Sequence, residues 1–557
     1  MSAALVFRCV LILKLMLAAT IVQGSESRRT VWFGLNGISD WSTQHPFIDH
    51  MKTARPWVGH LPGQWGGIEF EELVAVGAVD ANGWPTHVPD PARRLEALIL
   101  TDQPEEAEHL SGDYHVFYKG EATIEIKGLG RTKTRRPGHI VFSYRPGEGS
   151  VGISVQDVDP SDPLRNISVV HADYLDAHAN GELFHPLWLS HLKGVETLRF
   201  MDWMDTNNSP VANAAQIAQA DDFSYGWRGV PLGVMIALAN QIEANPWFTI
   251  PHQADDALVR QFAEDTVANL DPGRAVYVEY SNEVWNFIFE QSRWAQAQAE
   301  KLWGEQGDGW VQYYGLRAAQ IMDIWADVFA EPDHERLNRV IAVHTGWPEL
   351  EQSMLFGKHA TQELGRSPAE SFDAYAVTGY FGHDVAVPGI MHPLLDAAQE
   401  QVEADGKALG LSRVALREYV RPRQFEPVFA RAADMIRQGS LRELEQDVWP
   451  YHARVARDLG LDLIMYEGGT HATPQWSDVD DERLVSFLLA FNYSENMGAL
   501  YEQAIASWEE ISGSSFHAFV DVAPPSKWGS WGALRHLNDD NPRWRSLRRQ
   551  LDQAGAE

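Results

Sequence analysis

The stretch Ala275–Glu283 reads Ala-Val-Tyr-Val-Glu-Tyr-Ser-Asn-Glu, a β-type run of apolar and aromatic residues that ends in polar side chains. Seven other runs of this kind occur along the chain: Val31–Ile38, Val195–Trp203, Pro246–His252, Arg339–Trp347, Ala374–Gly382, Asp462–Gly469 and Phe516–Val522. Eight such runs alternating with helices predict an α/β fold, the closed (β/α)8 TIM barrel of parallel strands. A doubly wound open sheet is the competing fold, but Gly34–Gly37 lacks the glycine-rich fingerprint expected after its first strand.

Helical periodicity accompanies the β-type runs. The apolar positions of Ala254–Leu270 recur at intervals of three and four residues, which is typical of a helix with one buried face. We also expect helices in Ser292–Ala330 and Glu482–Ile511, and a second, helical elaboration of the barrel in Val414–Tyr451.

The interval between the first and second runs, from Ile38 to Val195, is too long for a simple alternation. Segments typical of strands lie within it, separated by Gly, Pro and Asp: Tyr114–Ile126, His139–Tyr144, Val151–Val158 and Ile167–Val170. We therefore predict an inserted antiparallel β-rich domain, residues 63–175, between strands 1 and 2. The barrel itself then comprises residues 25–62 and 176–557, and we expect the insertion to buttress it.

The composition restricts the partners of the protein. The chain has 557 residues, and 45 Lys and Arg against 77 Asp and Glu give a net charge of −32. Such a field repels phosphate backbones and anionic lipids, so we expect no nucleic-acid partner and no membrane contact beyond export. The 21 Trp residues are suited mainly to core packing, but a Trp at the mouth of a pocket could stack on a sugar ring.

The amino terminus is typical of a secretory signal peptide. Arg8 and Lys14 are basic, Val10–Val22 is mostly apolar, and Val22–Gly24 is an acceptable cleavage site. We predict a signal peptide at residues 1–24 and a secreted or periplasmic protein; an uncleaved anchor is the alternative. Since Cys9 is the only cysteine, the mature chain would have neither disulfides nor a thiolate zinc site.

Two of the runs place a glutamate at the end of an apolar strand. The fourth ends in Asn282 and Glu283, and the seventh, Leu463–Gly469, contains Glu467. The carboxyl ends of the strands carry the active site in barrels of this type, so both side chains can face one central cleft. Two carboxyl groups across a cleft, one protonated and one ionised, are what glycoside hydrolysis requires.

This pattern, Asn282-Glu283 after strand four with Glu467 after strand seven, resembles the clan A glycoside hydrolases, which are retaining (β/α)8 enzymes. The resemblance covers the barrel and not the insertion, and it does not identify a particular family. It implies that Glu283 is the general acid/base and Glu467 the nucleophile. It also implies that Asn282 binds the sugar 2-hydroxyl in the transition state, with an oligo- or polysaccharide as substrate.

The resemblance implies further substrate-binding residues. Arg199 on the second strand is similar to an arginine beside the nucleophile, and Tyr380 on the sixth to a tyrosine that hydrogen-bonds the nucleophile. His252 on the third strand would be a polar residue near the acid/base, and Trp528 or Trp531 would be the aromatic floor under the sugar. Each has a structural alternative: a salt bridge from Arg199 to Asp202, ordinary hydrogen bonding for the Tyr and His, and packing for the Trp residues.

Other interpretations stay open. Glu279 shares a face with Glu283 but lies deeper, which favours a buried ion pair for it. Histidines at or beyond strand ends suit a metal-dependent barrel hydrolase: His252, His344, His383 and His471. Because no His-x-His or His-Glu-x-x-His motif occurs there, we expect no metal and no cofactor. A non-catalytic carbohydrate-binding barrel is the third possibility.

Overall fold

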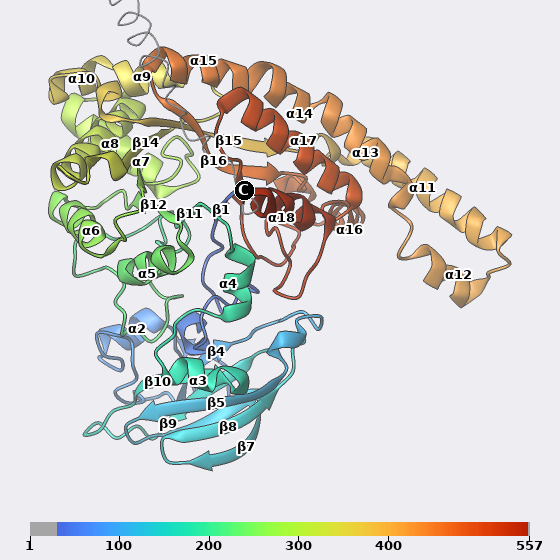
Figure 1. The fold of residues 1–557 in the computed structure, drawn as a ribbon. Coiled ribbons are helices and arrows are strands. Elements are labelled where there is room, and N and C mark those ends of the chain that lie inside the picture. The colour runs from blue at the N-terminus through green and yellow to red at the C-terminus, as the bar shows by residue number, and fades with distance from the viewer. Residues whose placement is uncertain (1–30, 555–557) are drawn as a thin grey trace, which may run out of the picture.

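The computed structural model describes residues 31–554, so the predicted signal peptide lies outside the described residues. Eight strands form a closed parallel barrel, in chain order around its circumference (Figure 1). They are β1 (Trp32–Gly34), β11 (Thr197–Arg199), β12 (Asn245–Ile250), β13 (Val276–Tyr280), β14 (Leu337–Ala342), β15 (Ala374–Phe381), β16 (Asp462–Thr470) and β17 (His517–Phe519). Each overlaps one of the eight predicted runs, and the predicted (β/α)8 barrel is confirmed.

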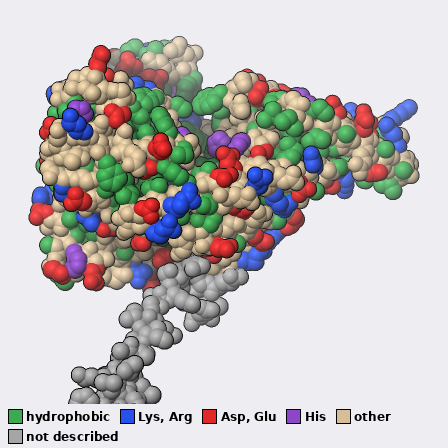
Figure 2. Space-filling model, turned by 90° about the horizontal axis from the view of Figure 1, so that it is seen from above, with side chains coloured by type: hydrophobic (Ala, Val, Ile, Leu, Met, Phe, Trp, Pro, Cys, Tyr) green, Lys and Arg blue, Asp and Glu red, His purple; other side chains and the backbone are tan. Residues whose placement is uncertain are grey.

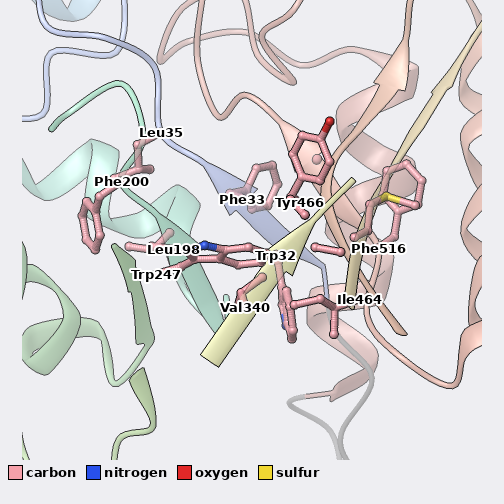
Figure 3. Packing of buried hydrophobic residues seen from close by; sticks show 14 of the residues in the cluster. Trp32, Phe33, Leu35, Leu198, Phe200, Trp247, Val340, Ile464, Tyr466 and Phe516 are labelled. Carbon is pink, nitrogen blue, oxygen red and sulfur yellow. The ribbon is translucent and has the colours of Figure 1, made fainter. Parts of the chain in front are cut away.

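Large buried side chains of the strands fill the barrel interior (Figure 3). The rings of Trp32 and Trp247 meet edge to face with centroids 6.3 Å apart, and the ring of His517 lies 5.6 Å from that of Trp247. The indole Nε1 of Trp247 donates to Glu279 Oε2 over 3.0 Å. This aromatic layer therefore supports the polar side chains that follow it toward the carboxyl ends of the strands.

The helices that connect and surround these strands are α4 (Pro186–Leu192), α5 (Leu232–Ile242), α6 (Asp256–Asn269), α7 (Glu290–Trp303), α8 (Gly309–Val328), α9 (Leu350–Phe356), α10 (Lys358–Leu364), α16 (Glu482–Phe491), α17 (Glu495–Ser512) and α18 (Pro542–Ala554). The two segments expected to be helical, Ser292–Ala330 and Glu482–Ile511, each contain a break between two helices. Gly304 ends α7 with a positive φ of 72°, which glycine adopts without strain. Ser494 caps α17 by accepting a hydrogen bond from the Met497 amide, which starts a new helix after α16.

The segment between β1 and β11 forms two antiparallel sheets, as predicted. The first has the order β3 (Gly67–Ile68), β2 (Val58–His60), β4 (Arg94–Ile99), β9 (Val151–Gln156) and β6 (Thr123–Gly128), and the second the order β10 (Arg165–His171), β5 (Gly112–Lys119), β8 (His139–Tyr144) and β7 (Arg131–Arg136). The short helix α2 (Phe70–Ala75) lies between β3 and β4 in the chain, and α3 (Leu175–Ala179) follows β10. The domain boundaries at residues 62/63 and 175/176 stay a prediction.

Several details of the insertion correct the expectation from sequence. The predicted strand Tyr114–Ile126 is two strands, β5 and β6, because the chain turns at Gly120 with φ 94°. The edge strand β7 is exposed along its whole length and reads Arg-Thr-Lys-Thr-Arg-Arg. Because it has no alternating apolar residues, the sequence pattern did not predict this strand. Charged residues on an edge strand oppose pairing with other chains.

Five histidine rings gather where the insertion meets the barrel: His45, His50, His109, His171 and His185. His45 lies 5.5 Å from His50 and 5.9 Å from His109, which in turn lies 5.9 Å from His185 at the start of α4 (ring centroids). Burial lowers the pKa of His45 to about 3 and that of His109 to about 4, and holds the pKa of His50 well below its ordinary value. The rings of His45, His50 and His109 are therefore neutral at pH 7.

This junction predicts a pH-dependent stability. Below about pH 6.5 the unfolded chain takes up a proton at His50 that the folded chain excludes, so the free energy of unfolding falls by about 1.4 kcal/mol per pH unit for this residue. We expect His50→Phe to remove that contribution. The free energy of unfolding in urea should then fall less between pH 6 and pH 5 than in the wild type, by roughly that amount. Equal slopes for His50→Phe and the wild type would contradict the prediction.

Helices between β15 and β16 form the second elaboration. They are α11 (Pro388–Ala408), α12 (Arg413–Val420), α13 (Glu426–Gln438), α14 (Ser440–Glu443) and α15 (Trp449–Leu459), with a π-helical turn between the last two. Helices α11 and α12 project from the barrel as an arm (Figure 1), and Lys and Arg side chains gather toward its outer end (Figure 2). Within residues 31–554, no helix is long and apolar enough to cross a membrane.

Candidate active site

Glu467 lies near the carboxyl end of β16 and is buried. Arg199, at the end of β11, donates from Nη1 to Glu467 Oε1 over 2.8 Å. The hydroxyl of Tyr380 on β15 donates to Glu467 Oε2 over 2.9 Å. Because both carboxylate oxygens accept hydrogen bonds from other strands, the carboxylate has a fixed orientation, as nucleophilic attack requires.

A β-bulge in β16 brings the residue before Glu467 into the same site. The pairing of β15 with β16 skips Tyr466, since Met465 and Glu467 pair with consecutive residues of β15. A bulge interrupts the alternation of side chains along a strand, so two neighbouring residues can face the same side. The hydroxyl of Tyr466 donates to Glu283 Oε1 over 3.0 Å. Tyr466 thus binds one glutamate and directly precedes the other in the chain.

Glu283 follows β13 in a sharp turn. Ser281 and Glu283 have left-handed backbone conformations with φ 59° and 41°, which cost about 1 kcal/mol each in a residue with a side chain. The half-buried carboxyl group accepts from Tyr466 at Oε1 and from Asn286 Nδ2 at Oε2, over 3.0 Å in each case. The turn therefore directs Glu283 toward β16 and the site of Glu467.

Arg199 connects the members of the site. Besides the bond to Glu467, its Nη2 donates to Glu279 Oε2 over 2.9 Å and to Asn282 Oδ1 over 3.0 Å. Its ion pairs are with the buried Glu279 and Glu467, and the salt bridge to Asp202 considered from sequence is not among them. Glu279 has the buried ion pair expected for it. One guanidinium thus neutralises part of the charge of two buried carboxylates and orients Asn282.

Burial and charge set the protonation of the site. Burial raises the pKa of Glu467 to about 8; Arg199 opposes this shift and the nearby Glu283 adds to it. Burial likewise raises the pKa of Tyr380 and of Tyr466 well above the ordinary value, so both hydroxyls remain protonated donors. The bonds from Arg199 and Tyr380 favour the ionised form, which is the form that can attack, but burial outweighs them, so that form predominates only above about pH 8.

Asn282 is buried within an amide network that sequence reasoning missed. Its Nδ2 donates to Asn207 Oδ1 over 3.1 Å, and Gln291 Nε2 donates to the same oxygen over 2.7 Å and to the Asn282 carbonyl over 2.8 Å. Asn207 follows β11 and Gln291 lies on α7. Polar residues in the loops after strands were the only sequence signal for this network. It holds the Asn282 amide in place without using its second N–H.

The two predicted tryptophans occupy different places. Trp531 lies beside Tyr380 with ring centroids 6.1 Å apart, and its ring is 5.4 Å from that of His471. Trp528 is more than half exposed and instead pairs with Trp476 at 5.7 Å. Of the two, Trp531 is therefore the one that the structure joins to the residues around Glu467.

His252 is separate from this network. Its ring packs against Trp294 at 5.9 Å, and burial lowers its pKa to about 4. None of the hydrogen bonds found for residues 31–554 joins it to Glu283 or Glu467. In the part of the chain that the structure describes, no three His, Cys, Asp or Glu side chains are grouped so as to hold a metal ion.

Strand topology and this site together define an α/β-barrel protein with a pair of glutamates at the carboxyl ends of its strands. No family model and no curated protein matches the chain. Among solved structures it is similar to a fungal β-1,4-galactanase, with 11% identity, a TM-score of 0.31 and coverage of 67% of this chain and 96% of the galactanase. An exo-β-agarase gives 9% identity, a TM-score of 0.16 and coverage of 86% and 95%. Likeness at this level carries no argument about activity.

Proposed function

We propose that this chain is a retaining glycoside hydrolase that cleaves a β-linked glycan. The placement of Glu283 and Glu467 at the ends of two barrel strands, with contacts that connect them, supports the proposal most strongly. Tyr466, next to Glu467 on β16, donates to Glu283. Arg199 donates both to Glu467 and to Asn282, the residue before Glu283. Retention requires the two carboxyl groups to lie about 5–5.5 Å apart, with one of them ionised and held by donors. Arg199 and Tyr380 supply such donors to Glu467.

In the first step the ionised Glu467 attacks the anomeric carbon while the glycosidic C–O bond breaks. Glu283 gives its proton to the departing oxygen. In the second step a water molecule loses a proton to Glu283 as its oxygen bonds to the anomeric carbon, and Glu467 leaves as a carboxylate. The Asn282 amide has a second N–H beyond the one that binds Asn207, and this N–H is available to the sugar 2-hydroxyl.

The substrate class and location belong to the same proposal. A net charge of −32 favours a neutral oligo- or polysaccharide over a polyanion. The basic and apolar residues before Ser25 support export, which would place the enzyme where extracellular or periplasmic glycans occur.

A panel assay with the wild-type enzyme tests the proposed function. We expect hydrolysis of at least one class of β-linked glycan and of the matching aryl glycoside, and proton NMR of the first product should show the β-anomer before mutarotation. An initial α-anomer would contradict the retaining mechanism. Absence of turnover on neutral β-glucans, β-galactans, β-mannans, β-xylans and agar would contradict the activity itself.

A further inference from the structure

Aromatic rings gather on the loops that follow β13 and β14 and at the start of α8, near Glu283 in the chain. Phe287 contacts Trp310 with centroids 5.3 Å apart, Trp310 contacts Trp347 at 6.3 Å, and Trp347 contacts His344 at 6.3 Å. About half of Trp347 is exposed. We call these four residues the first ring set. Contiguous exposed apolar surface of this kind marks binding sites more often than single exposed residues do.

The first ring set is held in place at the mouth of the barrel. Asn286, which binds the Glu283 carboxyl group, directly precedes Phe287 in the chain. One turn after Trp310, the buried Tyr314 donates its hydroxyl proton to the carbonyl oxygen of Ala342 over 3.1 Å at the end of β14. The start of α8 is therefore fixed over the strand ends, and the rings of this set extend outward from Glu283.

A second ring set, consisting of Trp476, Trp528 and Trp531, lies on the segments that follow β16, the strand of Glu467, and β17. The ring centroids of Trp476 and Trp528 lie 5.7 Å apart. Trp476 is 79% exposed and Trp528 is 52% exposed. Trp531, three residues after Trp528, is the ring that contacts Tyr380 and so leads back to the nucleophile. In the closed strand order the first set follows β13 and β14, and the second follows β16 and β17. The first set therefore belongs to the Glu283 side of the barrel mouth and the second to the Glu467 side.

We propose that the two ring sets are outer subsites for a neutral glycan chain that lies across the mouth of the barrel, so that the enzyme cuts within chains. This inference rests on the proposed function and adds the length and charge of the substrate. The flat face of an indole stacks on the C–H face of a pyranose ring and loses little conformational freedom in doing so. Rings on both flanks of the carboxyl pair give sugar units on both sides of the cleaved bond a binding surface.

Charges around the ring sets favour a neutral chain. Asp308 and Glu349 adjoin the first set in the sequence, and Asp478 and Asp480 follow Trp476. Lys527, whose ammonium lies 5.1 Å from the Trp528 ring centroid, is paired with Asp480 at 2.7 Å. A carboxylated or sulfated glycan would therefore meet more acidic than basic side chains on both flanks.

The test compares one long and one short substrate in the same enzyme. The long one is a six-unit oligosaccharide of the glycan cleaved in the panel, and the short one is its monosaccharide aryl glycoside. We expect Trp347→Ala and Trp476→Ala each to lower the ratio of kcat/KM for the long to the short substrate about 10-fold, since each removes one stacking surface. Trp65→Ala is the matched control, because Trp65 is 61% exposed but lies in the insertion.

The outcomes separate the two proposals. An unchanged ratio in both Trp347→Ala and Trp476→Ala would overturn the subsites while leaving the glycosidase intact. A wild-type enzyme without turnover would overturn the proposed function; tryptophan fluorescence titration with the six-unit neutral β-linked oligosaccharides of the panel then tests the ring sets alone. Tighter binding of a six-unit than of a two-unit oligosaccharide, lost in both variants and kept in Trp65→Ala, supports them. Equal binding of the two lengths would overturn them.

Discussion

Glu467→Ala should lower kcat on the aryl glycoside by at least about 10⁴-fold, since the variant has no group that can form the covalent intermediate. This loss corresponds to about 5.5 kcal/mol of transition-state stabilisation. Arg199, Tyr380 and Asn282 remain in place, so substrate binding should survive better than turnover. Initial rates over a range of substrate concentrations give kcat and KM separately.

Controls distinguish the loss of a nucleophile from the loss of a fold. Glu467→Ala also removes one partner of a buried arginine, so its thermal unfolding must be compared with that of the wild type. Glu96→Ala is a matched variant, because Glu96 is a buried glutamate that accepts a hydrogen bond from Arg94 but lies in the insertion. We expect Glu96→Ala to keep its turnover at temperatures where it is folded. Activity in folded Glu467→Ala near the wild-type level would remove the assignment.

Glu283→Gln should discriminate between leaving groups. Cleavage of the glycan, whose leaving alcohol needs a proton, should fall about 10³-fold in kcat/KM, because general acid catalysis contributes factors of this size. A dinitrophenyl glycoside needs no proton for departure, so its kcat/KM should fall far less. Equal losses on both substrates would contradict the assignment of Glu283 as the acid.

The same variant should keep the acidic limb of the pH profile. Glu467 must be ionised to attack, so kcat/KM is lost as the pH falls through its pKa, which burial raises to about 8. We expect this limb in the wild type and in Glu283→Gln, measured as kcat/KM on the dinitrophenyl glycoside. Loss of the limb in Glu283→Gln would contradict Glu467 as the group that must be ionised.

The barrel was predictable because its strands are continuous apolar runs with polar ends. Buried parallel strands need apolar side chains on both faces, which makes a run such as Val276–Tyr280 distinct from the helices around it. Glu283 and Glu467 could be singled out for the same reason, because a carboxylate at the end of such a run lies at the mouth of a barrel. Glu467 accepts hydrogen bonds from Arg199 and Tyr380, and the roles that the resemblance implies for these residues stay a prediction.

Other parts of the site had no local signal. Ordinary strand alternation would direct Tyr466 away from Glu467, and only the bulge, which depends on pairing with β15, turns it toward Glu283. Asn207 and Gln291 meet Asn282 through the packing of a loop and a helix that are distant in the sequence. Strand β7 was missed because its exposed, charged residues carry no burial pattern.

The configuration of the azide product from Glu467→Ala tests the central claim most directly, namely that Glu283 and Glu467 act on opposite faces of one sugar. With the nucleophile absent, azide can enter only the space that the carboxylate vacates, so the dinitrophenyl β-glycoside should give an α-glycosyl azide, identified by NMR. A β-glycosyl azide, or no rescue of the folded variant at any azide concentration, would contradict the account.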